Sequence, residues 1–414
     1  MTKNSVTNWL LLAIYLSLAI PMFYFIDGAI MIGGFGFMYH YLAGAGIVLI
    51  GFILFLILPD IRLLFKLSET SFVMVLSYIL PLVLSLFLWA IEAAETAMMI
   101  KGAFYSIYVI LAVMVSACTI YLLRNKAILI SCIAMSIANI MIIAPVATEG
   151  GMNEFMNELI SLIVTFGEDT GPLMKTIEIH DLTFAFGLYL MYAIINKDVY
   201  GRRVVICLSL IFSMTGLKRI AAAGIVIGVV LYNLLIRIPK KTVKRISLII
   251  IGLIIATSFI YITAVQRGLF DYLEIIGMDT KGRNLIYSYI SKLCDVNPAF
   301  LGHGLGFSGE KWKLPLYSKL HQDAYHNEFL KMFVELGFSG YFIWIFSNLP
   351  YRYIHMERSQ GKKGGLLFLG MAIYCYITYA TDNTYYYYYT NMAIFLLAMY
   401  PLGCSSVSEI RNGG

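Results

Sequence analysis

The residues best suited to chemistry are a histidine and several cations in the second half of the chain. His326 ends a long polar segment and is followed at once by Asn327 and an apolar run typical of a helix. Histidine takes up a proton near neutral pH and serves as a general base. Arg283 lies upstream in the run KGRNLIY, and arginine binds phosphate oxygens in pairs while staying charged. These residue types suit a site that binds a diphosphate and deprotonates a hydroxyl group.

A second cationic pair, Lys218-Arg219, interrupts an apolar run at TGLKRI. We place this pair on the external side of the membrane that the apolar runs predict, where basic residues oppose the usual bias. A charge that reaches the membrane centre costs about 2.5–3.5 kcal/mol. Two interpretations stay open: an anionic ligand compensates the pair, or both side chains extend to the membrane surface.

Other polar residues accompany these candidates. Asn327 is a favourable N-cap residue, so Asn327 and Glu335 are interpreted as supporting either the site or the helix itself. His303 lies in the run GHGLGF, a glycine-rich turn that can bring backbone amides close to an anion. His303 and His321 are the alternatives to His326 as the base, and His303 can instead donate to phosphate.

The sequence gives no indication of a metal or cofactor site. No histidine and carboxylate spacing resembles a zinc-binding helix, and no carboxylate cluster resembles a divalent-metal site. The six cysteines lack paired spacing and are interpreted as small core residues. We therefore expect chemistry that uses neither a metal nor a cofactor.

The composition predicts an integral membrane protein. Of the 414 residues, 60% are hydrophobic and 13% are charged, against roughly 25% charged in soluble domains. The mean hydropathy is +0.80. Continuous apolar runs of about 18 to 23 residues fit membrane-crossing helices and exclude the alternating pattern of a β-barrel. Lys and Arg in cytoplasmic loops explain the net charge of +6, so no nucleic-acid partner is expected.

We predict an all-α, polytopic fold in which residues 1–414 form a single integral membrane domain. About 12 transmembrane helices are expected from the apolar runs. Their predicted ranges are 8–26, 38–58, 71–91, 103–123, 127–146, 179–195, 204–215, 220–238, 246–264, 327–347, 366–382 and 388–403. The seventh range is short for a membrane span.

The loops between these ranges sort by charge onto two sides. If the N-terminus is cytoplasmic, the inside loops are basic and the outside segment 147–180 is acidic, as the positive-inside rule requires. Both termini are then cytoplasmic. The apolar stretch 155–166 is expected to lie along the membrane surface or to cover a cavity. The segment 266–325 forms a large periplasmic loop that carries most of the candidate site, since long loops are usually functional.

Five tyrosines follow one another at positions 385–389. Tyrosine rings collect where a membrane meets water, and they also stack on sugars. We favour an aromatic belt at the outer interface over a sugar-stacking platform.

The candidate residues also form an ordered set of short motifs. His326 and Asn327 are followed by Leu330, Glu335, Gly337 and Gly340, and they are preceded by Gly302, Gly304 and Gly306 and by Arg283 with Leu285. In their order and their placement around one long external loop, these motifs resemble the O-antigen ligase and O-antigen polymerase superfamily. The resemblance covers roughly residues 210–345, and the amino-terminal half is similar only in being a series of spans.

This resemblance implies a metal-independent membrane glycosyltransferase of the GT-C type. Such an enzyme acts on undecaprenyl-diphosphate-linked glycans at the periplasmic face of the bacterial inner membrane. The resemblance assigns His326 as the general base, and Arg283 and Arg219 as ligands of the donor diphosphate. The family often has Ser-Arg where this chain has Lys218-Arg219, so Lys218 shares or takes the role of Arg219.

Three functions remain open at this point. We favour an O-antigen or capsular polysaccharide polymerase, because polymerases are the more varied group in sequence. The alternative is an O-antigen ligase that transfers the glycan to lipid A–core. A flippase for lipid-linked sugars, which would carry charges through several spans, is the alternative from another class. Expected partners are the lipid-linked donor, a glycan acceptor, membrane lipids and a polysaccharide chain-length regulator. If the acceptor displaces the diphosphate in one step, the configuration at the anomeric centre is inverted.

Overall fold

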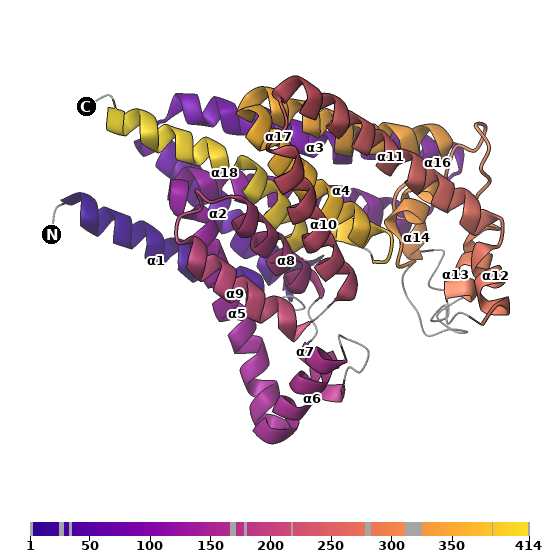
Figure 1. Ribbon diagram of the computed structural model, residues 1–414, viewed down its shortest axis with the longest axis horizontal. Helices are drawn as coiled ribbons and strands as arrows, with labels where there is room; N and C mark the ends of the chain where they lie inside the picture. The colour runs from indigo at the N-terminus through magenta and orange to yellow at the C-terminus, as the bar shows by residue number, and fades with distance from the viewer. Residues whose placement is uncertain are drawn as a thin grey trace.

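The computed structural model describes residues 3–24, 29–32, 35–165, 171–177, 180–216, 218–277, 283–310, 325–382 and 384–412. His321 lies outside these ranges. Helices dominate the described chain (Figure 1). Strands β1 (Ala29–Ile32) and β2 (Phe35–Met38) form a short antiparallel hairpin, which is an exception to the all-α prediction.

Each predicted span falls on one helix of the structure. These helices are α1 (Lys3–Tyr24), α2 (Tyr39–Ile57), α3 (Ile61–Ile91), α4 (Thr96–Leu123), α5 (Ala127–Glu149), α8 (His180–Ile195), α9 (Arg202–Thr215), α10 (Arg219–Leu235), α11 (Lys240–Gln266), α16 (Glu328–Phe346), α17 (Arg352–Tyr379) and α18 (Tyr388–Asn412). Shorter elements connect them, namely η1 (Arg124–Lys126), α6 (Met152–Val164), α7 (Pro172–Ile177), α12 (Leu269–Ile275), α13 (Arg283–Ile290), α14 (Phe307–Glu310), η2 (Ser347–Tyr351) and η3 (Thr384–Tyr386).

Several helical stretches are long and apolar enough to cross a membrane. Within the described residues there are five, Tyr39–Ile57, Ile61–Ile91, Thr96–Glu149, Lys240–Gln266 and Glu328–Tyr379. Shorter apolar helices cover Trp9–Tyr24, Asp181–Ile195 and Arg219–Leu235. The polytopic membrane fold is therefore confirmed, and the number of crossings stays a prediction.

The basic loops meet at one end of the bundle. The Tyr400 hydroxyl donates to the Asn125 carbonyl over 2.9 Å and accepts from the Tyr200 amide over 3.0 Å. Lys244 at the start of α11 forms an ion pair with Glu357 of α17, with 3.3 Å between nitrogen and oxygen. Figure 1 shows both chain termini on one side of the molecule and α12 and α13 on the opposite side. The contacts thus place the basic loops, which the sequence predicts to be cytoplasmic, together at one end of the bundle.

The other end is formed by the segment before α16 and by the ends of α3 and α4. The Trp89 indole donates to the Leu305 carbonyl over 3.1 Å. The Lys101 ammonium donates to the Gly309 carbonyl over 3.0 Å. These contacts fix the glycine-rich turn and α14 against the helix bundle.

Helices α10 and α17 pack closely in antiparallel directions. A Cβ atom on Gly224 would lie 3.3 Å from the Tyr374 Cα, and a Cβ atom on Gly228 would lie 3.2 Å from the Gly370 carbonyl oxygen. Gly224 thus lies opposite Tyr374 and Gly228 opposite Gly370, so a step of four residues forward along α10 matches a step of four residues backward along α17. Continuing this register places Arg219, at the start of α10, level with the last residue of α17.

Gly337 interrupts the helical backbone of α16. Its φ of 68° lies in the left-handed region, and a Cβ atom there would lie 2.1 Å from the carbonyl carbon of Leu301. The Phe338 amide donates to the Phe300 carbonyl over 2.8 Å, and the Gly304 amide donates to the Glu335 carbonyl over 2.7 Å. The kink thus seats the glycine-rich turn directly against α16.

The aromatic-belt prediction is wrong for most of the tyrosine run. Tyr385, Tyr386, Tyr388 and Tyr389 are buried inside the protein. The Tyr385 hydroxyl donates to the Ser77 carbonyl over 3.0 Å. The run therefore packs into the bundle interior, where the Tyr385 and Tyr389 hydroxyls donate to carbonyls of α3 and α1.

Gly337→Ala is expected to lower the free energy of unfolding by about 3 kcal/mol, because it combines backbone strain with overlap against a neighbouring carbonyl. Gly361→Ala is the matched control, since Gly361 has a φ of 72° and nothing within 4 Å of an added Cβ atom. That change carries only the strain cost of about 1–2 kcal/mol. Thermal unfolding in detergent compares the two variants. Equal losses of stability would contradict the close seating of the turn.

Candidate active site

The candidate site begins at the amino-terminal end of α16. The Asn327 side chain is the N-cap, as the sequence predicts, and its Oδ1 accepts from the Leu330 amide over 3.0 Å. Its Nδ2 donates to the Ala380 carbonyl over 3.1 Å. Asn327 is fully buried. One side chain therefore both starts α16 and ties it to the end of α17.

His326 stands immediately before this cap and is half-buried. Its φ of 49° lies in the left-handed region. Such a conformation is uncommon outside glycine and costs about 1–2 kcal/mol, and strained residues of this kind cluster at functional sites. The capped helix and its tie to Ala380 hold His326 in this strained position.

Arg283 is the first residue of α13, and its Nη2 donates to the Thr381 carbonyl over 3.5 Å. Tyr287 lies one turn further along the same helix and is buried. Burial raises the pKa of the Tyr287 phenol, the neighbouring Tyr261 adds to this rise, and the Arg283 guanidinium lowers it. Arg283 and Asn327 thus converge on adjacent residues, Thr381 and Ala380, at the end of α17.

Lys218 and Arg219 lie at the start of α10. The α10–α17 register places them level with the same end of α17 where Arg283 and Asn327 are bound. Lys218 is half-buried and Arg219 is exposed. The structure therefore brings Arg283, Lys218 and Arg219 to one level of the bundle, from the start of α13 and the start of α10.

An apolar groove of about 560 Å³ leads away from this level, between α10, α11, α16 and α17. Tyr261 and Ala380 line it beside the candidate site, and Ile220 lines it beside Arg219. Ile227, further along α10, also lines the groove and is exposed on the apolar surface of the bundle. The groove therefore joins a cationic site to a membrane-facing surface.

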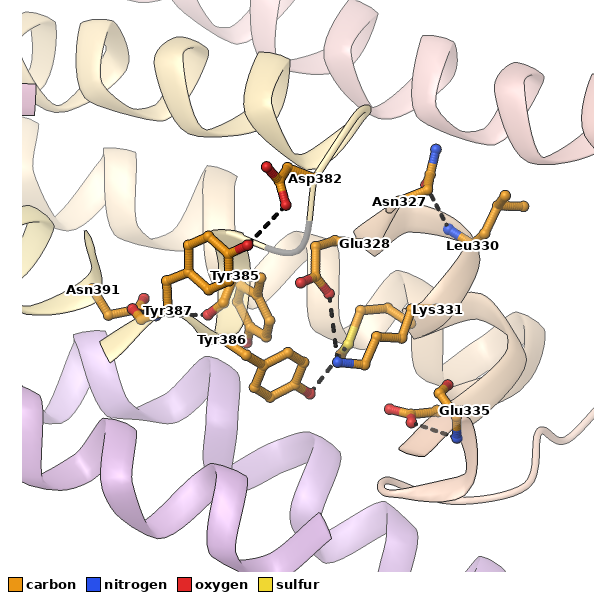
Figure 2. Close-up of polar contacts among 12 residues, drawn as sticks. Asn327, Glu328, Leu330, Lys331, Glu335, Asp382, Tyr385, Tyr386, Tyr387 and Asn391 are labelled. Atoms are coloured by element: carbon orange, nitrogen blue, oxygen red, sulfur yellow. Dashed lines mark hydrogen bonds and ion pairs between the residues drawn. The ribbon is translucent and has the colours of Figure 1, made fainter. Parts of the chain in front are cut away.

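A polar face of α16 lies on the other side of the site. Glu328 and Glu335 are buried there, while the Lys331 side chain keeps 13% of its surface exposed. The Lys331 ammonium lies 4.0 Å from a Glu328 carboxylate oxygen and 3.8 Å from the centre of the Tyr386 ring. Figure 2 shows Glu328 and Lys331 facing the tyrosine run, with Asn327 directed away from them.

The glycine-rich turn does not present its amides to solvent. The Ser308 amide donates to the Glu335 carboxylate over 3.0 Å, and the Leu305 amide donates to the Ser85 hydroxyl over 2.9 Å. The anion that this turn meets is therefore Glu335 of the protein itself. The sequence suggested that the turn could bind a ligand anion. These contacts instead indicate a structural role for the turn and for Glu335.

His303 is held by the protein through both ring nitrogens. Nδ1 lies 2.9 Å from a Glu92 carboxylate oxygen, and Nε2 lies 3.0 Å from the Leu293 carbonyl oxygen. The ring also stacks on Phe307, with 4.1 Å between the ring centres. Both ring nitrogens of His303 are occupied by contacts within the protein, so neither is left to contact an acceptor hydroxyl, which favours His326 as the base.

Residues 204–345 match the family model described as O-antigen ligase. This part of the chain is similar to that family, and the match supports the O-antigen ligase and polymerase superfamily. The resemblance read from the motifs is thereby confirmed. No curated protein matches the chain.

Members of the matched family are glycosyltransferase-like enzymes of the ligase and polymerase type, and the apolar helices of this chain fit the integral membrane location of such enzymes. His326, Arg283, Arg219 and Lys218 all lie inside the matched region. The turn at 380–387, on which Arg283 and Asn327 are anchored, lies outside it.

Sequence reasoning missed Thr381 and Asp382 in this turn. The Tyr387 hydroxyl donates to the Asp382 carboxylate over 2.9 Å, and both side chains are half-buried beside the Lys331 face. The only signal in the sequence is a short polar break, TDNT, between two apolar runs. Ala380 and Thr381, which bind Asn327 and Arg283, thus contribute to the candidate site from outside the matched region.

His303→Ala is expected to reduce stability without removing glycosyl transfer. The variant loses a stacking contact and the contacts of both ring nitrogens, together about 2 kcal/mol, so the unfolding midpoint falls by about 2 °C for a chain of this length. Turnover per folded molecule should stay within about threefold of wild type, because His303 is not the base. A loss of about a hundredfold or more in turnover, with normal folding, would restore His303 as the base.

Proposed function

We propose that this protein is an O-antigen or capsular polysaccharide polymerase that joins undecaprenyl-diphosphate-linked repeat units. The observation that carries the proposal is the convergence of Arg283, Asn327 and the start of α10 on the end of α17, beside an apolar groove. Cations next to a membrane-facing groove suit a ligand with a diphosphate head and a long hydrocarbon tail. The similarity of residues 204–345 to the O-antigen ligase family supports the same substrate class.

The proposal includes the topology of the chain. Residues 1–414 form one membrane domain of about 12 transmembrane helices of the GT-C type. Both termini are cytoplasmic, and the segment 266–325 with the site lies on the periplasmic side of the inner membrane. The meeting of the basic loops at one end of the bundle supports this orientation.

In the proposed reaction the donor lipid lies in the groove. Arg283, with Arg219 or Lys218, binds the diphosphate and stabilises the negative charge that grows on it as it leaves. His326 takes the proton of the acceptor hydroxyl while its oxygen attacks the anomeric carbon. One carbon–oxygen bond forms as the bond to the diphosphate breaks, so the single displacement inverts the anomeric centre. The arginines supply the charge stabilisation, and the reaction is proposed to be metal-independent.

A ligase is the second candidate, because the matching family model is described as O-antigen ligase. The two enzymes share the donor chemistry and differ in the acceptor. A polymerase uses a second lipid-linked repeat unit, with a chain-length regulator as its expected partner, whereas a ligase uses lipid A–core. The glycan profile of cells separates the two.

His326→Ala and Arg283→Ala are each expected to lower transfer by about 10²-fold or more, since each removes a group that acts in the transition state. The measurement is the surface glycan profile of a deletion strain complemented with each variant at matched membrane abundance. Single repeat units on core indicate a polymerase. Repeats that accumulate on the lipid carrier, with bare core, indicate a ligase.

Arg267→Ala is the matched control, because Arg267 is an exposed arginine at the end of α11, in the same external region. This variant should give the wild-type glycan profile. A wild-type profile from His326→Ala would remove His326 from the mechanism. Loss of the profile in Arg267→Ala as well would mean that general positive charge, and not the arranged site, is required.

A further inference from the structure

Helix α16 separates two chemically different regions that meet at its amino-terminal tip. Phe329 lines the apolar groove, and Asn327 donates to Ala380 on the same side. Glu328 and Lys331 face the other way, toward the tyrosine run (Figure 2). His326 precedes both sets of residues. A base at this tip has one region on each side, as a reaction between two substrates requires.

The region away from the groove has the composition of a sugar-binding surface. The Lys331 ammonium lies 3.8 Å from the centre of the Tyr386 ring and 5.2 Å from that of Tyr105. Tyr105, Asp382 and Tyr387 are half-buried and keep part of their surface accessible. Aromatic faces bind the apolar faces of sugars, while ammonium, carboxylate and phenol groups bind hydroxyls.

Glu328 differs from Glu335 in how its charge is satisfied. Glu335 accepts a hydrogen bond from the Ser308 amide. Glu328 is fully buried, and within the described chain neither carboxylate oxygen has a hydrogen-bond partner. Its ion pair with Lys331, at 4.0 Å, is the contact that compensates the buried charge. Glu328 therefore contacts the Lys331 ammonium as its ion-pair partner, and the Tyr386 ring contacts it through a cation–π interaction.

We propose that this polar face of α16 binds the acceptor sugar, with Lys331 contacting its hydroxyls and Glu328 positioning Lys331. The inference rests on the proposed glycosyl transfer and adds the location of the second substrate. The ligand is the non-reducing end of a neutral, hydroxyl-rich sugar. The donor lipid diphosphate remains on the groove side of α16.

The charges around the polar face keep the two substrates apart. Three acidic side chains, Glu328, Glu335 and Asp382, lie close to one another in this region, with Lys331 among them. A diphosphate would be repelled from such a surface, whereas a neutral sugar would not. On the groove side, Arg283 and the pair Lys218-Arg219 supply cations that attract the diphosphate. The sign of the local charge thus assigns each substrate to one side of His326.

The test is steady-state kinetics of the full-length protein in lipid nanodiscs, with a lipid-linked repeat unit as donor and a lipid-linked or core oligosaccharide as acceptor. Lys331→Met should raise the KM for the acceptor about tenfold or more, since a charge-assisted hydrogen bond is lost. The KM for the donor should change less than about twofold. Glu328→Gln should raise the acceptor KM in the same direction, with kcat little changed, because Glu328 acts through Lys331.

Lys244→Met is the matched control, because Lys244 also pairs with a buried glutamate, Glu357, but at the opposite end of the bundle. It should leave both KM values unchanged. The double variant Glu328→Gln/Lys331→Met removes both charges together, so no buried charge is left uncompensated if a single variant folds poorly. Its acceptor KM should also rise about tenfold or more.

The outcomes separate the two proposals. If the wild-type protein transfers no glycan under these conditions, the proposed function fails. If wild type transfers glycan and the folded Lys331→Met or double variant keeps the wild-type acceptor KM, the acceptor site is wrong and the function stands. A rise in the donor KM alone would move Lys331 to the donor side and would also overturn the inference.

Discussion

The hydrogen bond from the Asn327 side chain to the Ala380 carbonyl holds the two halves of the site together. Asn327 is fully buried, so a broken bond would leave a polar group unsatisfied inside the bundle, at a cost of about 1–3 kcal/mol. The same side chain caps α16 and so fixes where that helix starts. Arg283 binds the next carbonyl along, at Thr381. These two contacts position the candidate base and Arg283 at the end of α17, where the groove begins.

Buried ionisable groups elsewhere in the bundle are satisfied in different ways. Arg352 is buried toward the other end, where it donates to the Met74 carbonyl and to the Ser77 hydroxyl and lies 5.6 Å from the centre of the Tyr78 ring. Glu335 accepts from a backbone amide of the glycine-rich turn. These groups are tied to the protein's own backbone. Glu328 instead forms an ion pair with Lys331, a side chain that keeps part of its surface exposed, and this pairing leaves the ammonium available to a ligand.

The parts of the fold that follow from local sequence could be predicted. Apolar runs located the helices, and Asn327 was identifiable as a cap because its residue type and its place before an apolar run are local signals. Thr381 and Asp382 could not be found, because they enter the site only through the long-range packing of α10 and α16 on α17. The tyrosine run was misread for a related reason. An amphipathic ring fits a membrane interface and a polar bundle interior equally well, and only tertiary packing decides between them.

The separation of the groove from the polar face has a consequence for chain length. In a polymerase, the elongated product of one cycle is the donor of the next, but it is released on the acceptor side of α16. It must move its diphosphate across to the groove before it reacts again. If this transfer occurs without escape into the bilayer, synthesis is processive and gives long chains. If escape is faster, each cycle is a separate encounter, and chain lengths follow the ratio of the two rates.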